Sequence, residues 1–377
     1  MPLSANRAFE EADVVFMRRA LALAALGEGR TRPNPPVGAV VVRDGVVVGE
    51  GFHAQAGAPH GEAMALSAAG DLARGGTLYV TLEPCHHHGL TPPCTRSILA
   101  AGIARVVAAA PDRNPRVAGG GLAALRQAGV AVALGTCAEE AEALIAPFAR
   151  HAATGRPLVT AKYAMTLDGR IASRGGDARW ISGPAARRRA HELRDVADAV
   201  LVGAGTVRAD DPRLTARGVG QGRAPRQPLR VVLDSQGTLP ETARVFAPEL
   251  PGRTVVATVG AAATHAARLE ARGVEVVRLP AAPDGRVALP ALLEWLGTRD
   301  IMALLVEGGS EVLGAFFSAS LVDRVVAFVA PKIVGGAGAP GPVGGAGGAM
   351  RMAEAVLLGD VRTERVGADL MVTGTVG

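Results

Sequence analysis

The stretch between Pro59 and Cys94 constrains this chain most strongly, because it brings together residue types that suit a bound metal ion. His60 offers an imidazole nitrogen, and Cys85 and Cys94, each preceded by a proline, offer two thiolates. These are typical zinc ligands, and three protein ligands leave the fourth tetrahedral position open, as catalytic zinc sites do. The sequence therefore predicts a zinc site at His60, Cys85 and Cys94.

Glu62 follows His60 after one intervening residue, and we predict that it is catalytic rather than a ligand. A His-x-Glu pattern followed by a Pro-Cys pair and a second cysteine is typical of zinc-dependent deaminases that act on nucleobases and related rings. In that chemistry the glutamate takes a proton from water and passes one to the departing amine. Each residue alone is more often structural or solvated, but their order and spacing together favour the catalytic interpretation.

The residues around this pattern predict two helices whose N-termini carry ligands. Pro59 and Pro93 each precede a helix-like segment, at residues 63–69 and 95–101, and proline suits the first turn of a helix. We therefore expect His60 and Cys94 beside the positive ends of helix dipoles, which favour a thiolate over a thiol.

Length and composition predict an enzyme of two domains. At 377 residues the chain can form two cores, and with 49% hydrophobic but 3% aromatic residues these cores should consist of Ala, Val and Leu. No apolar run reaches the ~18 residues of a transmembrane helix, and the N-terminus lacks a signal-peptide pattern. The three cysteines leave only Cys137 outside the metal site, which excludes a disulfide framework. We expect a cytoplasmic protein that does not bind membranes.

The charge distribution argues against a nucleic-acid substrate. The chain has a net charge of +5, but residues 1–150 contain 13 Arg, no Lys and 13 acidic residues, and are formally neutral. Nucleic-acid enzymes usually present a basic surface with aromatic side chains for stacking. A nucleic-acid-editing deaminase is therefore disfavoured. A non-catalytic zinc module is the other alternative, and it is disfavoured because neither Glu62 nor an open ligand position would be needed in a structural site.

The order of expected elements predicts an α/β sandwich with a mixed sheet in residues 1–150. A helix at residues 6–26 precedes a hairpin whose turn is Arg43-Asp44-Gly45, and helices and strands then alternate. The expected strands are residues 39–42, 46–49, 77–82, 105–110 and 130–134, and further helices are residues 119–128 and 138–149. Residues 153–157 are the expected linker to a second domain at residues 151–377.

The second half contains two glycine turns that could meet a phosphate. Gly203-x-Gly205 follows a strand at residues 199–202 but lacks the third glycine of a dinucleotide-binding fingerprint. The turn Glu307-Gly308-Gly309 is better placed, because it joins a strand at residues 301–306 to a helix at residues 311–318. A tight turn without a ligand is its structural alternative. Strand-like runs at residues 324–329, 362–366 and 370–375 predict an antiparallel end to a mostly parallel sheet.

Two local expectations complete the second half. We expect Ser182 to be the N-cap of a helix at residues 185–196, with Pro184 in its first turn. We expect the glycine-dense segment at residues 335–348 to be a mobile loop.

Several further motifs resemble one enzyme family. They are Pro33-Asn34-Pro35, Gly49-Glu50-Gly51-Phe52-His53, Thr81-Leu82-Glu83-Pro84-Cys85, the long insert of residues 86–93 and Pro111-Asp112-Arg113-Asn114-Pro115. Together they resemble the bifunctional pyrimidine deaminase/reductase of riboflavin biosynthesis, over nearly the whole chain. The resemblance implies a cytidine-deaminase-like α/β/α sandwich followed by a dihydrofolate-reductase-like α/β domain. It also implies Zn²⁺ and NADPH as cofactors, and it leaves a homo-oligomer as an option for assembly.

The resemblance implies two consecutive reactions on phosphorylated pyrimidines. The first is hydrolytic deamination of 2,5-diamino-6-ribosylamino-4(3H)-pyrimidinone 5′-phosphate. The second is NADPH-dependent reduction at C1′ of the ribose of 5-amino-6-(5-phosphoribosylamino)uracil, which gives the ribityl product.

Site residues follow from the same resemblance. Pyrimidine or ribose contacts in the deaminase are implied for Asn34, His53 and His87. Contacts with NADPH are implied for Ala164, Trp180, Thr206, Asp210, Ser235 and Gly309. Contacts with the reductase substrate are implied for Arg194, Leu214, Arg217 and Glu307.

Lys162 is added on separate grounds. The chain has 38 Arg but only two Lys, Lys162 and Lys332, and a lysine retained against such a preference indicates a need for a compact ammonium group.

Four positions depart from the family pattern. Gly61 stands where the family usually has Ala, and His86 replaces a small hydroxyl residue. Leu90 replaces a basic residue that resembles a phosphate contact, so we expect Arg96 or Arg116 to supply that charge. Ala178 stands where a serine is frequent.

Overall fold

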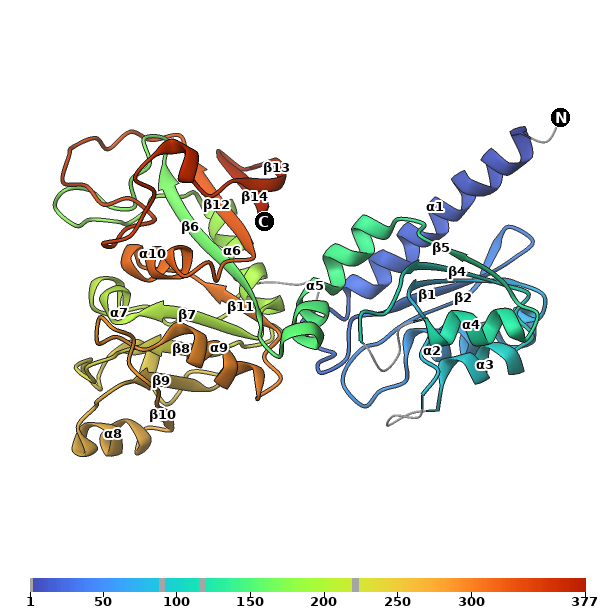
Figure 1. Cartoon of the computed structure of the whole chain (residues 1–377), viewed down its shortest axis with the longest axis horizontal. Helices are drawn as coiled ribbons and strands as arrows, with labels where there is room; N and C mark the ends of the chain where they lie inside the picture. The colour runs from blue at the N-terminus through green and yellow to red at the C-terminus, as the bar shows by residue number, and fades with distance from the viewer. Residues whose placement is uncertain (1–2, 88–91, 115–118, 219–223) are drawn as a thin grey trace. The chain divides into compact units, whose positions relative to one another are not determined.

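A computed structural model describes residues 3–87, 92–114, 119–218 and 224–377. Leu90 and Arg116 lie outside these ranges. The chain separates into two compact units, Met1–Gly155 and Arg156–Gly377 (Figure 1). Within the described residues, no helix combines the length and the apolar character needed to cross a membrane.

The first unit is built on a mixed sheet, as the sequence predicted. Its strands, in the order β2-β1-β3-β4-β5, pair antiparallel from β2 to β3 and parallel from β3 to β5. The strands are β1 (Gly38–Arg43), β2 (Val46–Phe52), β3 (Thr77–Leu82), β4 (Arg105–Ala110) and β5 (Ala131–Leu134).

Helices cover both faces of this sheet, which confirms the predicted α/β/α sandwich (Figure 1). Successive strand residues point to opposite faces, so Val40 packs on one side and Val41 on the other. Helices α1 (Leu3–Ala25) and α5 (Ala138–Thr154) contribute to the first side. The second side is covered by α2 (Gly61–Ala69), α3 (Cys94–Ala100) and α4 (Gly120–Gln127), and a 3₁₀ turn at Gly70–Ala73 follows α2.

The second unit contains a nine-stranded sheet in the order β10-β9-β8-β7-β11-β6-β12-β14-β13. The first seven strands in this order, from β10 through to β12, pair in parallel. Strand β14 pairs antiparallel with both β12 and β13, which confirms the predicted antiparallel end. The strands are β6 (Leu158–Thr166), β7 (Ala199–Gly203), β8 (Leu229–Leu233), β9 (Thr254–Thr258), β10 (Val274–Arg278), β11 (Ala303–Val306), β12 (Arg324–Ala330), β13 (Leu358–Val366) and β14 (Asp369–Val376).

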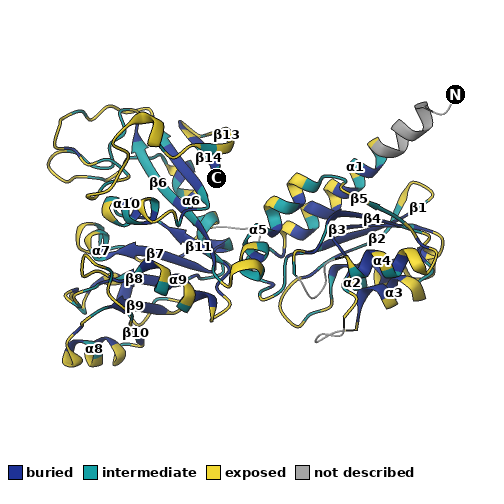
Figure 2. Ribbon diagram, viewed as in Figure 1, coloured by how far each residue is buried: buried dark blue, intermediate teal, exposed yellow. Residues whose placement is uncertain are grey.

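Apolar clusters lie on both faces of this sheet, and its central strands are buried (Figure 2). Leu292 and Phe316, from α9 and α10, pack on one face, and Val207 and Leu269, from α7 and α8, pack on the other. The helices are α6 (Pro184–Val196), α7 (Ala204–Asp210), α8 (Ala263–Glu270), α9 (Leu289–Gly297) and α10 (Ser310–Ser318), with 3₁₀ turns at Arg244–Phe246 and Met352–Glu354.

The expected N-cap at Ser182 is wrong. Helix α6 begins at Pro184, and its N-cap is Gly183, whose backbone N–H donates to Asp369 Oδ2 at 2.7 Å. Asp369 is buried and comes from β14, far away in the sequence. The start of α6 is therefore fixed by a distant carboxylate that holds the N-cap residue, and it has no N-cap side-chain hydrogen bond.

The glycine-dense segment at residues 335–348 is a loop without helix or strand, as expected, and it makes specific contacts with α10. The Ser310 hydroxyl donates to the carbonyl of Gly341 at 2.7 Å, and the Gly344 N–H donates to the carbonyl of Ser310 at 3.0 Å. A Cβ on Gly314 would lie 1.6 Å from the Gly344 carbonyl oxygen. Glycine in α10 thus allows this segment to lie directly against the helix.

Candidate active sites

Three predicted metal ligands converge in the first unit. His60 is the N-cap of α2, Cys85 follows β3, and Cys94 is the first residue of α3. The His60 Nδ1 atom lies 3.7 Å from Cys85 Sγ and 3.3 Å from Cys94 Sγ. One ligand atom from each residue lies within 4.8 Å of the others. The predicted helix N-termini therefore present the ligands to a common point.

The two thiols differ in acidity. A hydrogen bond from Cys94 lowers the pKa of Cys85 to about 4, and His60 lowers it further. The same hydrogen bond and burial raise the pKa of Cys94. Cys85 is therefore a thiolate, the form that binds metals, and a divalent cation would take the place of the proton that Cys94 retains. This donor set fits zinc.

The Glu62 carboxyl group shows a second feature of an active metal site. Its side chain is buried, and its Oε2 atom has no hydrogen-bond partner within the described part of the chain. Burial raises the pKa of Glu62, and the charge of Cys85 raises it further. An unpaired buried polar atom is costly, so this oxygen indicates a place for an additional polar species.

Two of the predicted substrate contacts form one hydrogen-bonded pair beside the metal ligands. His53 Nδ1 lies 3.1 Å from the carbonyl oxygen of Pro59, so it carries the proton and donates. Its Nε2 atom, 3.2 Å from Asn34 Nδ2, then accepts from the amide. Burial lowers the pKa of His53, which keeps the ring neutral, and its centroid lies 5.2 Å from that of His60.

His86 and His87, which follow Cys85, contact residues other than the predicted metal ligands. His87 is exposed and lies near the Asp112 carboxyl group. His86 Nδ1 lies 3.0 Å from the Thr95 hydroxyl, which ties the start of the insert to α3.

Glu83 is a structural residue of this site that sequence analysis missed. Its buried carboxylate accepts four backbone N–H groups, at 3.0–3.3 Å, from Asp112, Gly119, Gly121 and Leu122. Those amides include the start of α4, where N–H groups need acceptors. Glu83 therefore fixes the segment that carries Cys85. The signal available in the sequence was an acidic residue two positions before a predicted cysteine ligand.

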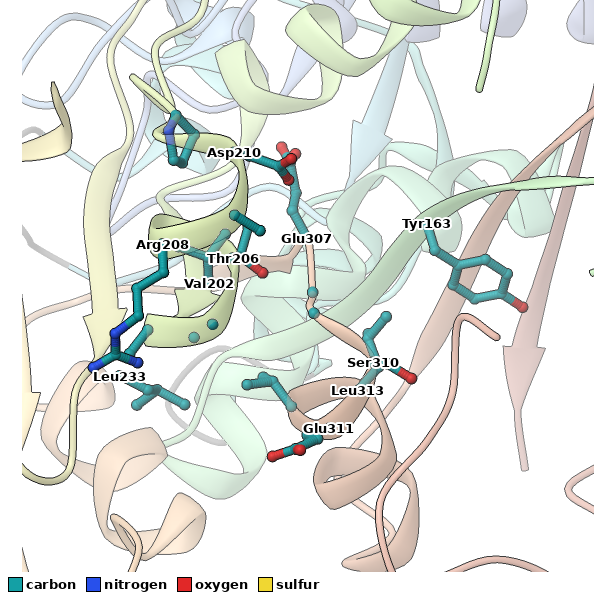
Figure 3. Close-up of a pocket in the computed structure, with 18 of the residues that line it drawn as sticks. Tyr163, Val202, Thr206, Arg208, Asp210, Leu233, Glu307, Ser310, Glu311 and Leu313 are labelled. Atoms are coloured by element: carbon teal, nitrogen blue, oxygen red, sulfur yellow. The ribbon is translucent and has the colours of Figure 1, made fainter. Parts of the chain in front are cut away.

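The second unit contains a large cleft, with a volume of about 1880 Å³, at the carboxyl ends of the parallel strands (Figure 3). Ligands of open α/β sheets bind at this edge. Every residue predicted for the reductase half lines it: Lys162, Ala164, Trp180, Arg194, Thr206, Asp210, Leu214, Arg217, Ser235, Glu307 and Gly309. Ala178 lines it too. Its volume exceeds that of typical small-molecule pockets, roughly 300–1,000 Å³, and leaves room for two ligands.

An ion cluster marks one part of the cleft. The guanidinium of Arg194 donates to both Glu307 oxygens, at 2.5 and 2.8 Å, and Lys162 Nζ lies 3.8 Å from Glu307 Oε2. Burial alone would raise the pKa of Glu307, but the charges of Arg194 and Lys162 hold it at about 2. Burial lowers the pKa of Lys162, and Glu307 opposes that effect. The longer Lys162 contact leaves its ammonium available to a ligand.

Positive charge gathers nearby at the mouth of the cleft. Burial lowers the pKa of Arg217, and the charges of Arg194, Arg213 and Arg244 lower it further. All four residues line the cleft. Arginines held close to one another favour an anion that can pair with several of them.

Two glycine turns form a cradle in the same cleft. The Gly203 N–H donates to the Gly308 carbonyl at 3.1 Å, so the turns after β7 and β11 lie side by side. A Cβ on Gly309 would lie 3.1 Å from Thr206 Oγ1, and one on Gly205 would meet no atom within 4 Å. Helix α10 begins directly after Gly309. Open backbone N–H groups at a helix N-terminus suit the pyrophosphate of a dinucleotide.

Trp180 and Asp210 lie at the rim of the cleft. Trp180 is 63% exposed, the Arg187 guanidinium lies 4.5 Å from its ring centroid, and Lys332 Nζ donates to its carbonyl at 2.5 Å. Burial raises the pKa of Asp210, and Arg179 opposes that effect. The second of the two lysines thus positions the backbone of a predicted cofactor contact.

Comparisons with known proteins find a matching family for each unit. Residues 10–110 match the family described as "Cytidine and deoxycytidylate deaminase zinc-binding region", and residues 157–372 match "RibD C-terminal domain". The Riboflavin biosynthesis protein RibD of Aquifex aeolicus is 42% identical over 362 residues, covering 96% of this chain and 98% of the relative. The Escherichia coli RibD is 43% identical over 334 residues, covering 86% and 89%.

Solved structures show the same likeness over the whole chain. Acinetobacter baumannii RibD (form 1) is 35% identical, with a TM-score of 0.85, and the match covers 98% of this chain and 99% of that one. A Thermotoga maritima diaminohydroxyphosphoribosylaminopyrimidine deaminase/5-amino-6-(5-phosphoribosylamino)uracil reductase is 38% identical, also with a TM-score of 0.85, covering 98% and 100%.

Fold, sites and similarities define a zinc-dependent deaminase joined to an NADPH-dependent reductase. The chain belongs to the RibD family, the bifunctional deaminase/reductase of riboflavin biosynthesis. Its fold is the predicted pair of a cytidine-deaminase-like and a dihydrofolate-reductase-like domain, and its cofactors are Zn²⁺ and NADPH. The family resemblance predicted from the sequence motifs is thereby confirmed.

Gly61, one departure from the family pattern, has no room for a side chain. A Cβ there would lie 2.7 Å from the carbonyl oxygen of Val37 and 3.3 Å from Phe52 Cα.

We predict that Gly61→Ala shifts the start of α2, lowers zinc occupancy and destabilises the first unit by about 1–3 kcal/mol. Metal analysis and thermal unfolding would measure this. Gly120→Ala in α4, where a Cβ meets no atom within 4 Å, is the matched control; equal behaviour of the two variants would contradict the prediction.

Proposed function

We propose that the first unit removes the ring amine from 2,5-diamino-6-ribosylamino-4(3H)-pyrimidinone 5′-phosphate, and that the second reduces the ribose of 5-amino-6-(5-phosphoribosylamino)uracil. The Thermotoga maritima relative is named as a deaminase and reductase of such compounds, which supports these substrates. We assign deamination to residues 1–150 and reduction to residues 151–377. The observation that carries the assignment is the convergence of His60, Cys85 and Cys94 near the unpartnered Glu62 oxygen.

His60, Cys85 and Cys94 would hold the zinc ion. When bound, it supplies the Lewis acidity that activates water for attack on the ring carbon. Glu62 accepts the proton of that water at Oε2 and delivers a proton to the departing amine. Its raised pKa suits this exchange, because a carboxyl group of ordinary acidity would hold the proton too weakly.

The remaining deaminase residues orient the substrate. The neutral ring of His53 fixes the Asn34 amide, which leaves the Asn34 carbonyl oxygen to accept from the pyrimidine. His87, exposed at the start of the insert, is placed to contact the ribose. These contacts hold the reacting carbon in position, and positioning is a large part of catalysis.

In the second unit the two glycine turns, with Thr206 and Gly309, would hold the pyrophosphate of NADPH, which supplies the hydride when bound. Ala164, Trp180, Asp210 and Ser235 would contact the rest of the cofactor. Arg194, Leu214, Arg217, Glu307 and Lys162 would bind the ribose phosphate substrate. Glu307 holds the Arg194 guanidinium at a fixed angle by a two-point contact, and the Arg217 cluster offers charge to the phosphate.

The metal ligands can be tested by substitution. We predict one zinc ion per chain, lost in Cys85→Ser or Cys94→Ser, because a hydroxyl does not replace a thiolate ligand. Cys137→Ser should retain the metal, since Cys137 is the N-cap of α5, away from the cluster. Metal analysis of the purified variants would measure this. Zinc loss in the Cys137 variant alone would show that the ligand set is wrong.

Glu62→Gln tests the separation of the two activities. The amide keeps the side-chain shape but cannot exchange protons, so deamination should fall roughly 10²–10⁴-fold with zinc retained. Reduction of a supplied deaminated substrate should continue, because Glu62 and the cleft lie in different compact units. Ammonia release and NADPH oxidation report the two reactions. Loss of both in a zinc-containing variant would contradict two separate sites.

We also propose that the second unit forms a homo-oligomer through β13. This strand lies at the sheet edge, and most of its residues are exposed. Met350, Met352 and Leu357 precede it and are 91%, 89% and 82% exposed. Open edges and apolar patches both favour association.

Light scattering tests this proposal. It should give a mass above 38.3 kDa, the mass of one chain, and a lower mass for Leu357→Lys. A single-chain mass at all concentrations would refute the proposal.

A further inference from the structure

Arg208 occupies a distinctive place in the cleft of the second unit. It lies in the last turn of α7, and its guanidinium donates to Thr238 Oγ1 in the segment that follows β8. The side chain extends away from Glu307, toward the end of β8 at Leu233 (Figure 3). Arg208 is exposed, and none of the described carboxylates lies within ion-pair distance of it. It is therefore a cation held in the cleft by a neutral partner.

The other arginines that line the cleft have different tasks. Arg194 and Arg286 pair with the carboxylates of Glu307 and Glu311. Arg179 and Arg187 donate to the backbone carbonyls of Asp210 and Ser182. A third set, Arg213, Arg217 and Arg244, belongs to the positive cluster near Arg194. Among the described arginines that line the cleft, Arg208 is thus one without a carboxylate partner or a place in the positive cluster, and it lies at the β8 end.

The groups around Arg208 suit a phosphate. The Ser235 oxygen accepts from the Val287 N–H at 3.1 Å, so its own hydroxyl proton can be donated elsewhere. Gln236 is exposed and also lines the cleft. Asp234, the nearest acid in sequence, is buried, and its Oδ2 atom accepts the N–H groups of Thr238 and Leu239, both at 2.8 Å. Its carboxylate is therefore turned into the protein rather than toward a ligand.

We propose that Arg208 binds the 2′-phosphate that distinguishes NADPH from NADH, with Ser235 and Gln236 as additional donors. This inference rests on the proposed placement of the cofactor in the cleft, and it adds the residue that sets cofactor preference. The glycine turns after β7 and β11 receive the pyrophosphate, and Arg208 projects from the helix that follows the first of them. An arginine near the adenosine ribose is a common means of recognising the extra phosphate.

The contribution of Arg208 to NADPH affinity follows from the geometry of a contact between guanidinium and phosphate. A planar guanidinium can donate two hydrogen bonds to one phosphate, and the Thr238 contact occupies only one nitrogen. A charge-assisted contact of this kind, at an exposed position, corresponds to a loss of about tenfold or more in affinity when the arginine is removed. Ligands without the 2′-phosphate should not change, because Arg208 would not touch them.

Equilibrium binding to the full-length protein tests the proposal without depending on turnover. Calorimetry would measure the affinities of NADPH, NADH, adenosine 2′,5′-bisphosphate and adenosine 5′-monophosphate. Arg208→Ala and Arg208→Gln should weaken the two 2′-phosphorylated ligands by about tenfold or more and leave the other two within about twofold. Binding of NADH at wild-type strength would also show that the variants are folded.

Two controls separate the outcomes. Arg189→Ala, on α6, removes an exposed arginine that pairs with Glu192 outside the cleft, and it should change none of the four affinities. Arg286→Ala removes a charge from the cleft that is already neutralised by Glu311. Selective loss of NADPH binding in Arg286→Ala but not in Arg208→Ala would overturn the assignment, as would equal loss of all four ligands in Arg208→Ala. Failure of the wild-type protein to bind any of them would instead overturn the placement of the cofactor.

Discussion

A carboxylate that is removed from water must find compensating partners, and each unit of this enzyme uses such a group directly after a strand to hold its site together. Glu83, after β3, collects four backbone N–H groups. Glu307, after β11, takes the two-point contact of Arg194 and the nearby charge of Lys162. In both units these hydrogen bonds and ion pairs join segments that are distant in the sequence. The geometry of each site therefore depends on its buried carboxylate.

Glu62 lacks such partners, and this contrast with Glu83 supports the catalytic role that we propose for it. It is as buried as Glu83, yet one of its oxygens has no partner among the described residues. The hydrogen bonds of Glu83 hold its carboxyl group in place, whereas Glu62, with an unsatisfied oxygen and a raised pKa, can exchange a proton. The same residue type thus fixes the backbone at the end of β3 and, at the start of α2, is suited to the proton transfer that we propose for Glu62.

Close backbone approach is the second constraint on both sites. Gly61 lets α2 begin against the carbonyl of Val37, and Gly121 lets α4 begin where a Cβ would lie 1.9 Å from the Pro84 carbonyl oxygen. In the second unit the paired turns at Gly203 and Gly308 expose backbone rather than side chains to the cleft. A side chain at Gly61 or Gly121 would push the start of α2 or α4 away from the backbone that it touches.

The sequence by itself determined the family, the two-domain fold and the residues expected at each site, because those signals are local: ligand types at a characteristic spacing, prolines and glycines at turns, and periodic apolar residues. Only the tertiary structure decided which distant groups complete them. Asp369 rather than Ser182 serves the start of α6, Glu83 organises α4, and Arg208 is directed to the β8 end of the cleft. Such partners come from other strands and helices, and no local pattern encodes which of many similar arginines or acids the fold will bring to a given place.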